Sequence, residues 1–118
     1  MENLLAILFQ ARNVAHVHHW KVKSFSLHLA LGELYESLIS FADDIAEMYM
    51  GRYGTNIDVT SVGPVGFSEQ DPLEFIRQLD KCLDDLKSTI PQDGFIVNKY
   101  EEIQGIVSQT KYKMENLR

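Results

Sequence analysis

A connecting stretch without helical periodicity, residues 51–70, constrains the topology of this chain most. It holds four of the seven glycines and one of the three prolines, and regions with helical spacing of apolar residues lie on both sides. A helix hairpin needs only a handful of connecting residues. About twenty extended residues cover roughly 60 Å, whereas a helix of about 24 residues spans roughly 35 Å. The connection can therefore return along a whole helix, so that the helices before and after it run parallel.

Apolar residues recur at three- and four-residue steps in two segments before this connection and in two after it. The expected helices cover residues 2–23, 27–50, 72–90 and 94–117. No segment shows the two-residue alternation of a strand. The sequence therefore predicts an all-α fold, a four-helix bundle with a long crossover between helices 2 and 3 as in ferritin-like proteins, in a single domain over residues 1–118.

Capping residues mark several of the expected helix ends. Ser24 or Ser26 caps the second helix, which we expect to end before Gly51 and Gly54. The third helix begins at the Asp-Pro pair of residues 71–72, where the aspartate caps the helix and the proline takes its first position.

All four histidines lie within thirteen residues of the expected first and second helices. His16 and His19 share one face of the first helix, His18 points away from the apolar face that we expect His19 to use, and His28 lies inside the apolar arc of the second helix. That arc also includes Leu31, Tyr35, Leu38, Ile39, Ala42, Ile45, Ala46 and Tyr49. A single histidine on an apolar face is usually a core residue, and spacing alone favours that interpretation here.

Asp43 and Glu47 form a carboxylate pair at i,i+4 spacing on the edge of the same arc. Such a pair can be a solvated helix edge. However, like charges at this spacing repel by a few tenths of a kcal/mol, and Asp44 adds to the negative charge. A bound cation would turn this repulsion into attraction. Imidazole together with carboxylate is a ligand mixture suited to iron, manganese or zinc.

The second half of the chain offers no histidine, and the motif Glu-x-x-His occurs nowhere. A di-iron site within one ferritin-like bundle draws carboxylates from all four helices and uses that motif twice. A metal site confined to the first two helices must therefore be completed by another subunit, or it stays half-coordinated.

This region resembles a known family, the Dps mini-ferritins. The matching residues are His19-Trp20-Lys21-Val22-Lys23, Phe25, Leu27-His28, Glu33-Leu34-Tyr35 and Ala42-Asp43-Asp44-Ile45-Ala46-Glu47. The resemblance implies that His19 and His28 of one subunit meet Asp43 and Glu47 of its two-fold mate in an inter-subunit ferroxidase site. It also implies iron as the metal and a homo-oligomer that is at least a two-fold dimer; the ligand types leave manganese or zinc as alternatives. The expected function is Fe(II) oxidation or sequestration.

Several features depart from the family pattern. Gly32 stands where the family usually has an acid, four residues after the second histidine, and the segment between the two histidines is shorter. These departures favour an alternative, a non-enzymatic structural or interaction module with a degraded metal site. By the same resemblance, Trp20 lies next to the site and His16 lies behind the ligands; Trp20 is equally well interpreted as a core aromatic residue.

Charge and cysteine content limit the expected partners and location. The formal net charge is −6 at pH 7, and the chain lacks the basic tail with which some members of that family bind DNA. We therefore expect no nucleic-acid partner and no membrane surface. Cys82 is the only cysteine, which is typical of a reducing compartment. No apolar run approaches the length of a transmembrane helix. We therefore expect a cytoplasmic location.

Overall fold

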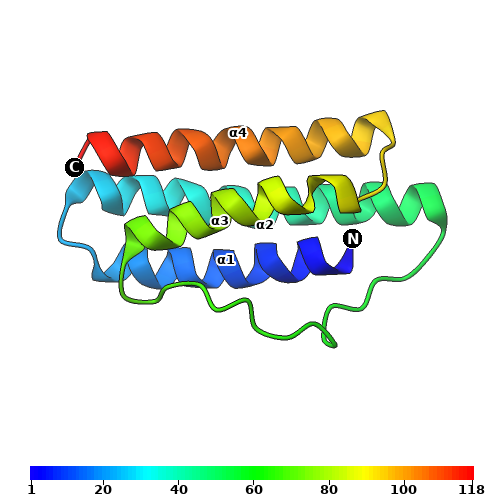
Figure 1. Ribbon diagram of the computed structural model, residues 1–118, viewed down its shortest axis with the longest axis horizontal. Coiled ribbons are helices and arrows are strands. Elements are labelled where there is room, and N and C mark those ends of the chain that lie inside the picture. The colour runs from blue at the N-terminus through cyan, green and yellow to red at the C-terminus, as the bar shows by residue number, and fades with distance from the viewer.

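The computed structural model describes residues 1–118 and contains four α-helices and no strand (Figure 1). The helices are α1 (Glu2–Lys21), α2 (Phe25–Tyr53), α3 (Pro72–Leu86) and α4 (Gly94–Asn116), with a short 3₁₀ turn, η1 (Lys87–Thr89), after α3. The all-helical fold predicted from the apolar periodicity is confirmed, and the arrangement is compatible with a four-helix bundle. None of the helices combines the length and apolar character needed to cross a membrane.

Apolar side chains from all four helices meet in one core. Helix α2 packs against α1 on one side and against α4 on the other, and α3 packs mainly on α4 and also touches α1. Fully buried residues come from each of the four helices, among them Leu8, Leu34, Leu79 and Ile103. Large apolar side chains nevertheless stay exposed on both α1 and α2.

The connection between α2 and α3 follows the length of α1 (Figure 1). Its hydrogen bonds to α1 advance in the same order along both segments: Glu2 with Asp58, Gln10 with Gly63 and Val65, and His18 with Ser68. Helix α3 consequently begins near the end of the molecule where α2 begins (Figure 1).

The predicted caps are present, but α2 is longer than expected. The Ser24 hydroxyl accepts the backbone N–H of Leu27, and the Asp71 carboxylate caps α3. The prediction that α2 ends before Gly51 is wrong: the helix continues to Tyr53, and Gly54 closes it in the left-handed conformation with φ 64°. A glycine inside a helix costs only about 1 kcal/mol relative to alanine, and the extra turn gains contacts to α4.

Other helix boundaries lie close to the expected ones. The fourth helix opens at Asp93 and Gly94 as predicted. Helix α3 ends at Leu86 instead of near residue 90, because its last turn tightens into η1.

Several residues that were assigned to apolar faces do not lie in the core, among them His19, His28, Ile39 and Tyr49. His18, not His19, is the buried histidine of α1, with 2% of its surface exposed. Ile39 of α2 is 38% exposed. Both differences follow from tertiary packing: the connection covers the side of α1 that carries His18, and no other segment covers the outer face of α2 that carries Ile39.

Candidate metal centre

His19 and His28 face each other across the tight turn that joins α1 to α2. His19 lies in the last turn of α1 and His28 in the first turn of α2. The Nδ1 atom of His19 lies 2.6 Å from the backbone oxygen of His28, and the Nδ1 atom of His28 lies 2.8 Å from the backbone oxygen of His19. The two rings stack with their centroids 3.8 Å apart and their planes 19° from parallel. The structure therefore brings these two predicted ligands together.

These reciprocal hydrogen bonds determine which ring nitrogen of each histidine carries the proton. A carbonyl oxygen can only accept, so each Nδ1 must donate, and the lone pair of the neutral ring lies on Nε2. Histidine ligands of metals are commonly held in this way, with the second ring N–H donated to a backbone carbonyl or a carboxylate. Both side chains are half-buried. When neutral, each ring thus presents one oriented nitrogen donor, its Nε2 atom.

The predicted carboxylate ligands lie elsewhere on α2. Asp43 and Glu47 are exposed on α2. The side chain of neither residue makes a hydrogen bond or an ion pair within the chain. Asp43 follows His28 by fifteen residues, which corresponds to roughly 22 Å along a helix. The neighbouring Asp44 is paired with Lys99, at 3.5 Å. Within a single chain, no group of three or more histidine, cysteine or acidic side chains is close enough to hold a metal ion.

Residues 19–114 match a protein family described as Family of unknown function (DUF5856). The chain belongs to this family. The matched region begins at His19 and also contains His28, Asp43 and Glu47. Comparisons with curated proteins and with solved structures gave no match.

Aromatic side chains surround the histidine pair of this DUF5856 protein. His16 stacks on Tyr35 with centroids 4.0 Å apart, and the rings of Tyr35 and His19 meet in a T-shaped arrangement with centroids 5.5 Å apart. Partial burial, and then the charges of Arg12 and His19, lower the pKa of His16, which favours its neutral form. Trp20 packs beside His16 at 4.5 Å but is 68% exposed, so its interpretation as a core aromatic residue is wrong.

His18 has a structural role that spacing did not predict. Its Nε2 atom lies 2.7 Å from the backbone oxygen of Ser68, and its ring packs against Phe75 of α3 with centroids 5.5 Å apart. It thereby holds the connection and α3 against α1. Because His18 is buried among these segments, it does not belong to the His19–His28 pair.

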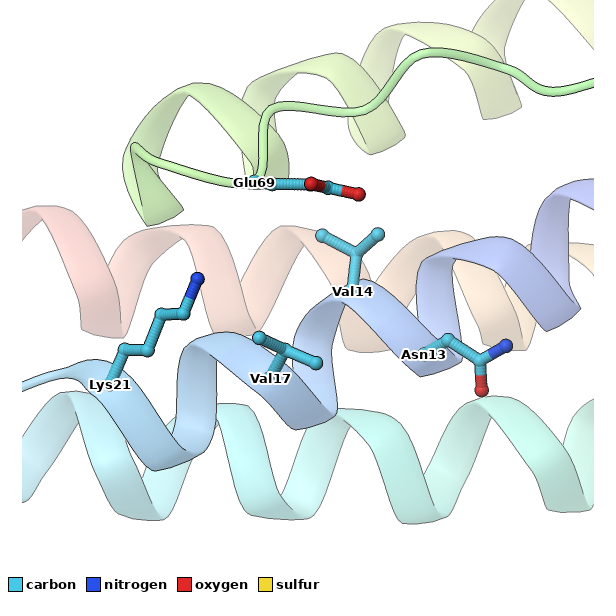
Figure 2. Close-up of a pocket in the computed structure, with 5 residues that line it drawn as sticks. All are labelled: Asn13, Val14, Val17, Lys21 and Glu69. Atoms are coloured by element: carbon cyan, nitrogen blue, oxygen red, sulfur yellow. The ribbon is translucent and has the colours of Figure 1, made fainter.

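A separate hollow of about 190 Å³ lies between α1 and the connection (Figure 2). Val14 and Val17 form its apolar floor, Asn13 and Lys21 border it from α1, and Glu69 reaches over it from the connection (Figure 2). These residues occupy a different face of α1 from His19. The hollow has one carboxylate and no imidazole, so the ligand set discussed above does not extend into it.

Proposed function

We propose that this DUF5856 protein is a Dps-like iron-binding protein that binds Fe(II) between two subunits and oxidises or sequesters it. The observation that carries this proposal is the reciprocal pair of hydrogen bonds between His19 and His28. They orient two imidazoles at one end of a helix pair and leave both Nε2 atoms as donors. A histidine pair that only filled space would not require either orientation.

A second copy of the chain can supply the carboxylates that one chain lacks. If α2 runs antiparallel to its copy, with a two-fold axis near residues 35–36, His28 of one chain faces Asp43 of the other, and the relation repeats by symmetry. Glu47 lies one helical turn beyond Asp43. Asp43 and Glu47 have no partner within their own chain, so such a dimer would pair them with the histidines and the metal.

Each residue type has a chemical role in the proposed site. Asp43 and Glu47 would neutralise much of the charge of the iron, and His19 and His28 would add neutral donors. A metal ion binds an imidazole in the plane of the ring, and these two planes are nearly parallel, so they do not converge on one ion. We therefore expect each ring to hold its own Fe(II) ion. The iron is the substrate: two Fe(II) ions together give two electrons, which would reduce dioxygen to hydrogen peroxide, or hydrogen peroxide to two water molecules, with two protons taken from solvent.

The path of the connection supports the ferritin-like part of the proposal. Residues 54–71 lie along α1 and bring the chain back before α3 begins (Figure 1). A bundle in which the second and third helices run parallel after a long crossover is typical of ferritin-like proteins.

The second candidate function is a non-enzymatic interaction module with a degraded metal site. Two observations favour it: Gly32 provides no carboxylate beside His28, and a single chain contains no complete ligand group. In this case the His19–His28 hydrogen bonds would only fasten α1 to α2. Metal binding separates the two functions directly.

A titration with Fe(II) under anaerobic conditions, followed by an oxidation assay, tests the proposal. We expect Asp43→Asn and His28→Ala to weaken iron binding and slow oxidation, because both remove a ligand. Glu74→Gln and Glu101→Gln serve as controls, since both glutamates are exposed and lie on α3 and α4, away from the proposed interface. A ligand that binds only the native state adds about 2.7 kcal/mol of stability at a hundredfold excess over its Kd, so iron should raise the melting temperature of the native protein and of both controls.

His18→Ala is unsuitable as a control, because removing a buried side chain changes stability by itself. If the native chain binds no iron, or if all four variants bind it equally well, the ferroxidase proposal fails and the interaction module is favoured.

A further inference from the structure

Gly32 makes an unusually close approach to the histidine pair. It lies one helical turn after His28 in α2, and a Cβ atom built on it would lie 3.1 Å from Cε1 and 3.2 Å from Nδ1 of His19. These distances are shorter than ordinary van der Waals contacts between carbon and neighbouring atoms. By contrast, a Cβ atom on Gly51 of the same helix, or on Gly105 of α4, would meet nothing within 4 Å.

We infer that Gly32 is a positioning residue for the imidazole of His19. Its missing side chain lets the His19 ring approach the backbone of α2, where Nδ1 reaches the carbonyl of His28. The ring has little room to move away, because it stacks on His28 and makes a T-shaped contact with Tyr35. An added methyl group would push the ring out of this position. The effect of Gly32 on metal binding rests on the proposed function, whereas its effect on the position of the ring does not.

Local helix stability gives no reason for a glycine at this position. Glycine destabilises a helix interior relative to alanine, because it loses more backbone freedom on folding and adds no side-chain contact. The feature that distinguishes Gly32 is the close approach of His19. Gly32 therefore has a packing role of its own. Any side chain at position 32, including the acid of the family pattern, would compete with the His19 ring for the same space.

A double-mutant cycle on the metal-free protein tests the steric part of this inference. Gly51→Ala, the matched control in the same helix, should raise the melting temperature, because alanine is the better helix former and its methyl group meets nothing. Gly32→Ala should fail to raise it in the native background, yet should raise it in a His19→Ala background, where the ring is gone. An equal increase in both backgrounds would overturn the inference.

Nitrogen-15 NMR of the imidazoles, also without metal, reports the orientation of His19 directly. The native protein and Gly51→Ala should show a proton on Nδ1 and a free lone pair on Nε2 for both His19 and His28. In Gly32→Ala we expect His19 to lose this signature. A change of overall stability alone would not alter the tautomer of one histidine. An unchanged His19 signal in Gly32→Ala would contradict the positioning role.

A cobalt(II) titration connects the position of the ring to metal binding. Loss of a group that orients a ligand typically lowers metal affinity by roughly tenfold to a hundredfold. We expect a decrease of that size for Gly32→Ala and none for Gly51→Ala. If the native protein binds no cobalt, the proposed function fails, while the double-mutant cycle and the NMR signal still decide the positioning role. Equal cobalt affinity in the native protein and Gly32→Ala would overturn the role of Gly32 at the metal site.

Discussion

His18 connects three segments of the chain through one side chain. It extends from α1, bonds to the carbonyl of Ser68 in the connection and packs on Phe75 of α3. We predict that His18→Ala lowers the free energy of unfolding by about 2–4 kcal/mol, because it leaves a cavity and an unpaired carbonyl. Urea unfolding at fixed protein concentration measures this. The exposed Asn13→Ala should change stability by about 0.5 kcal/mol or less; an equally small effect of His18→Ala would refute the structural role.

At the scale of elements, the last turn of α2 is tied to the first turn of α4. Asp93 occupies the N-cap position of α4, but its carboxylate makes no capping hydrogen bond to that helix. It accepts hydrogen bonds from Tyr53 and from Arg52 instead, the latter at 2.9 Å. The side chain of Asp93 is only 14% exposed. Both donors belong to the last turn of α2, so this contact favours the continuation of the helix past Gly51.

Because of these contacts, we expect Asp93 to make the stability of the protein vary with pH. The hydrogen bonds from Tyr53 and then from Arg52 lower the pKa of Asp93 below its ordinary value of 3.8. The ionised carboxylate therefore stabilises the native state above the pKa of the unfolded chain, and this contribution is lost as the pH falls through the lower native pKa. We expect the stability difference between the native protein and Asp93→Asn to be largest above about pH 5 and to shrink towards pH 2. Urea unfolding across this range measures it; a pH-independent difference would contradict the prediction.

At the scale of the whole molecule, α1 and α2 carry most of the large apolar side chains that remain exposed. Phe25 and Ile39 are exposed on the outer side of α2, and Asp43 lies one turn beyond Ile39. The exposed large apolar residues of these two helices are Phe9, Trp20, Phe25, Leu29, Ile39, Met50 and Tyr53. An exposed apolar surface of this kind is typical of an interface, and here it borders the histidine pair.

We predict a two-fold dimer that buries this surface. Ile39→Lys should yield a folded monomer. The fold should persist because Ile39 is already 38% exposed in the single chain, and the dimer should be lost because the interface would remove the lysine charge from water. Tyr112→Lys changes an exposed aromatic residue of α4 and should leave the dimer intact. Sedimentation with and without metal measures the mass, and circular dichroism checks the fold. Native protein that stays monomeric at micromolar concentration under both conditions would disprove the dimer, and a dimeric Ile39→Lys would exclude this interface.

Local sequence alone determined most of the secondary structure. Apolar residues at helical spacing identified all four helices, and Ser24, Asp71 and Gly54 act as caps because capping depends on a few neighbouring backbone groups. The end of α2 was the exception, since contacts with Asp93, far away in the sequence, support the additional turn. The four proposed ligands were also chosen from the sequence and its family resemblance, and their metal binding stays a prediction.

Only the tertiary structure decided which histidine enters the core and how the others are held. His18 and His19 are adjacent, and the helical wheel could not show that the connection would cover the side bearing His18. The sequence likewise presented Gly32 only as a missing acid, although an unexplained glycine inside a helix is a signal of close packing. The reciprocal bonds between His19 and His28 depend on the angle and separation of α1 and α2, which packing of the entire core sets. Residue spacing shows which side chains share a face of one helix. It does not show where a histidine ring lies against a neighbouring helix, because that position depends on all the contacts that pack the two helices together.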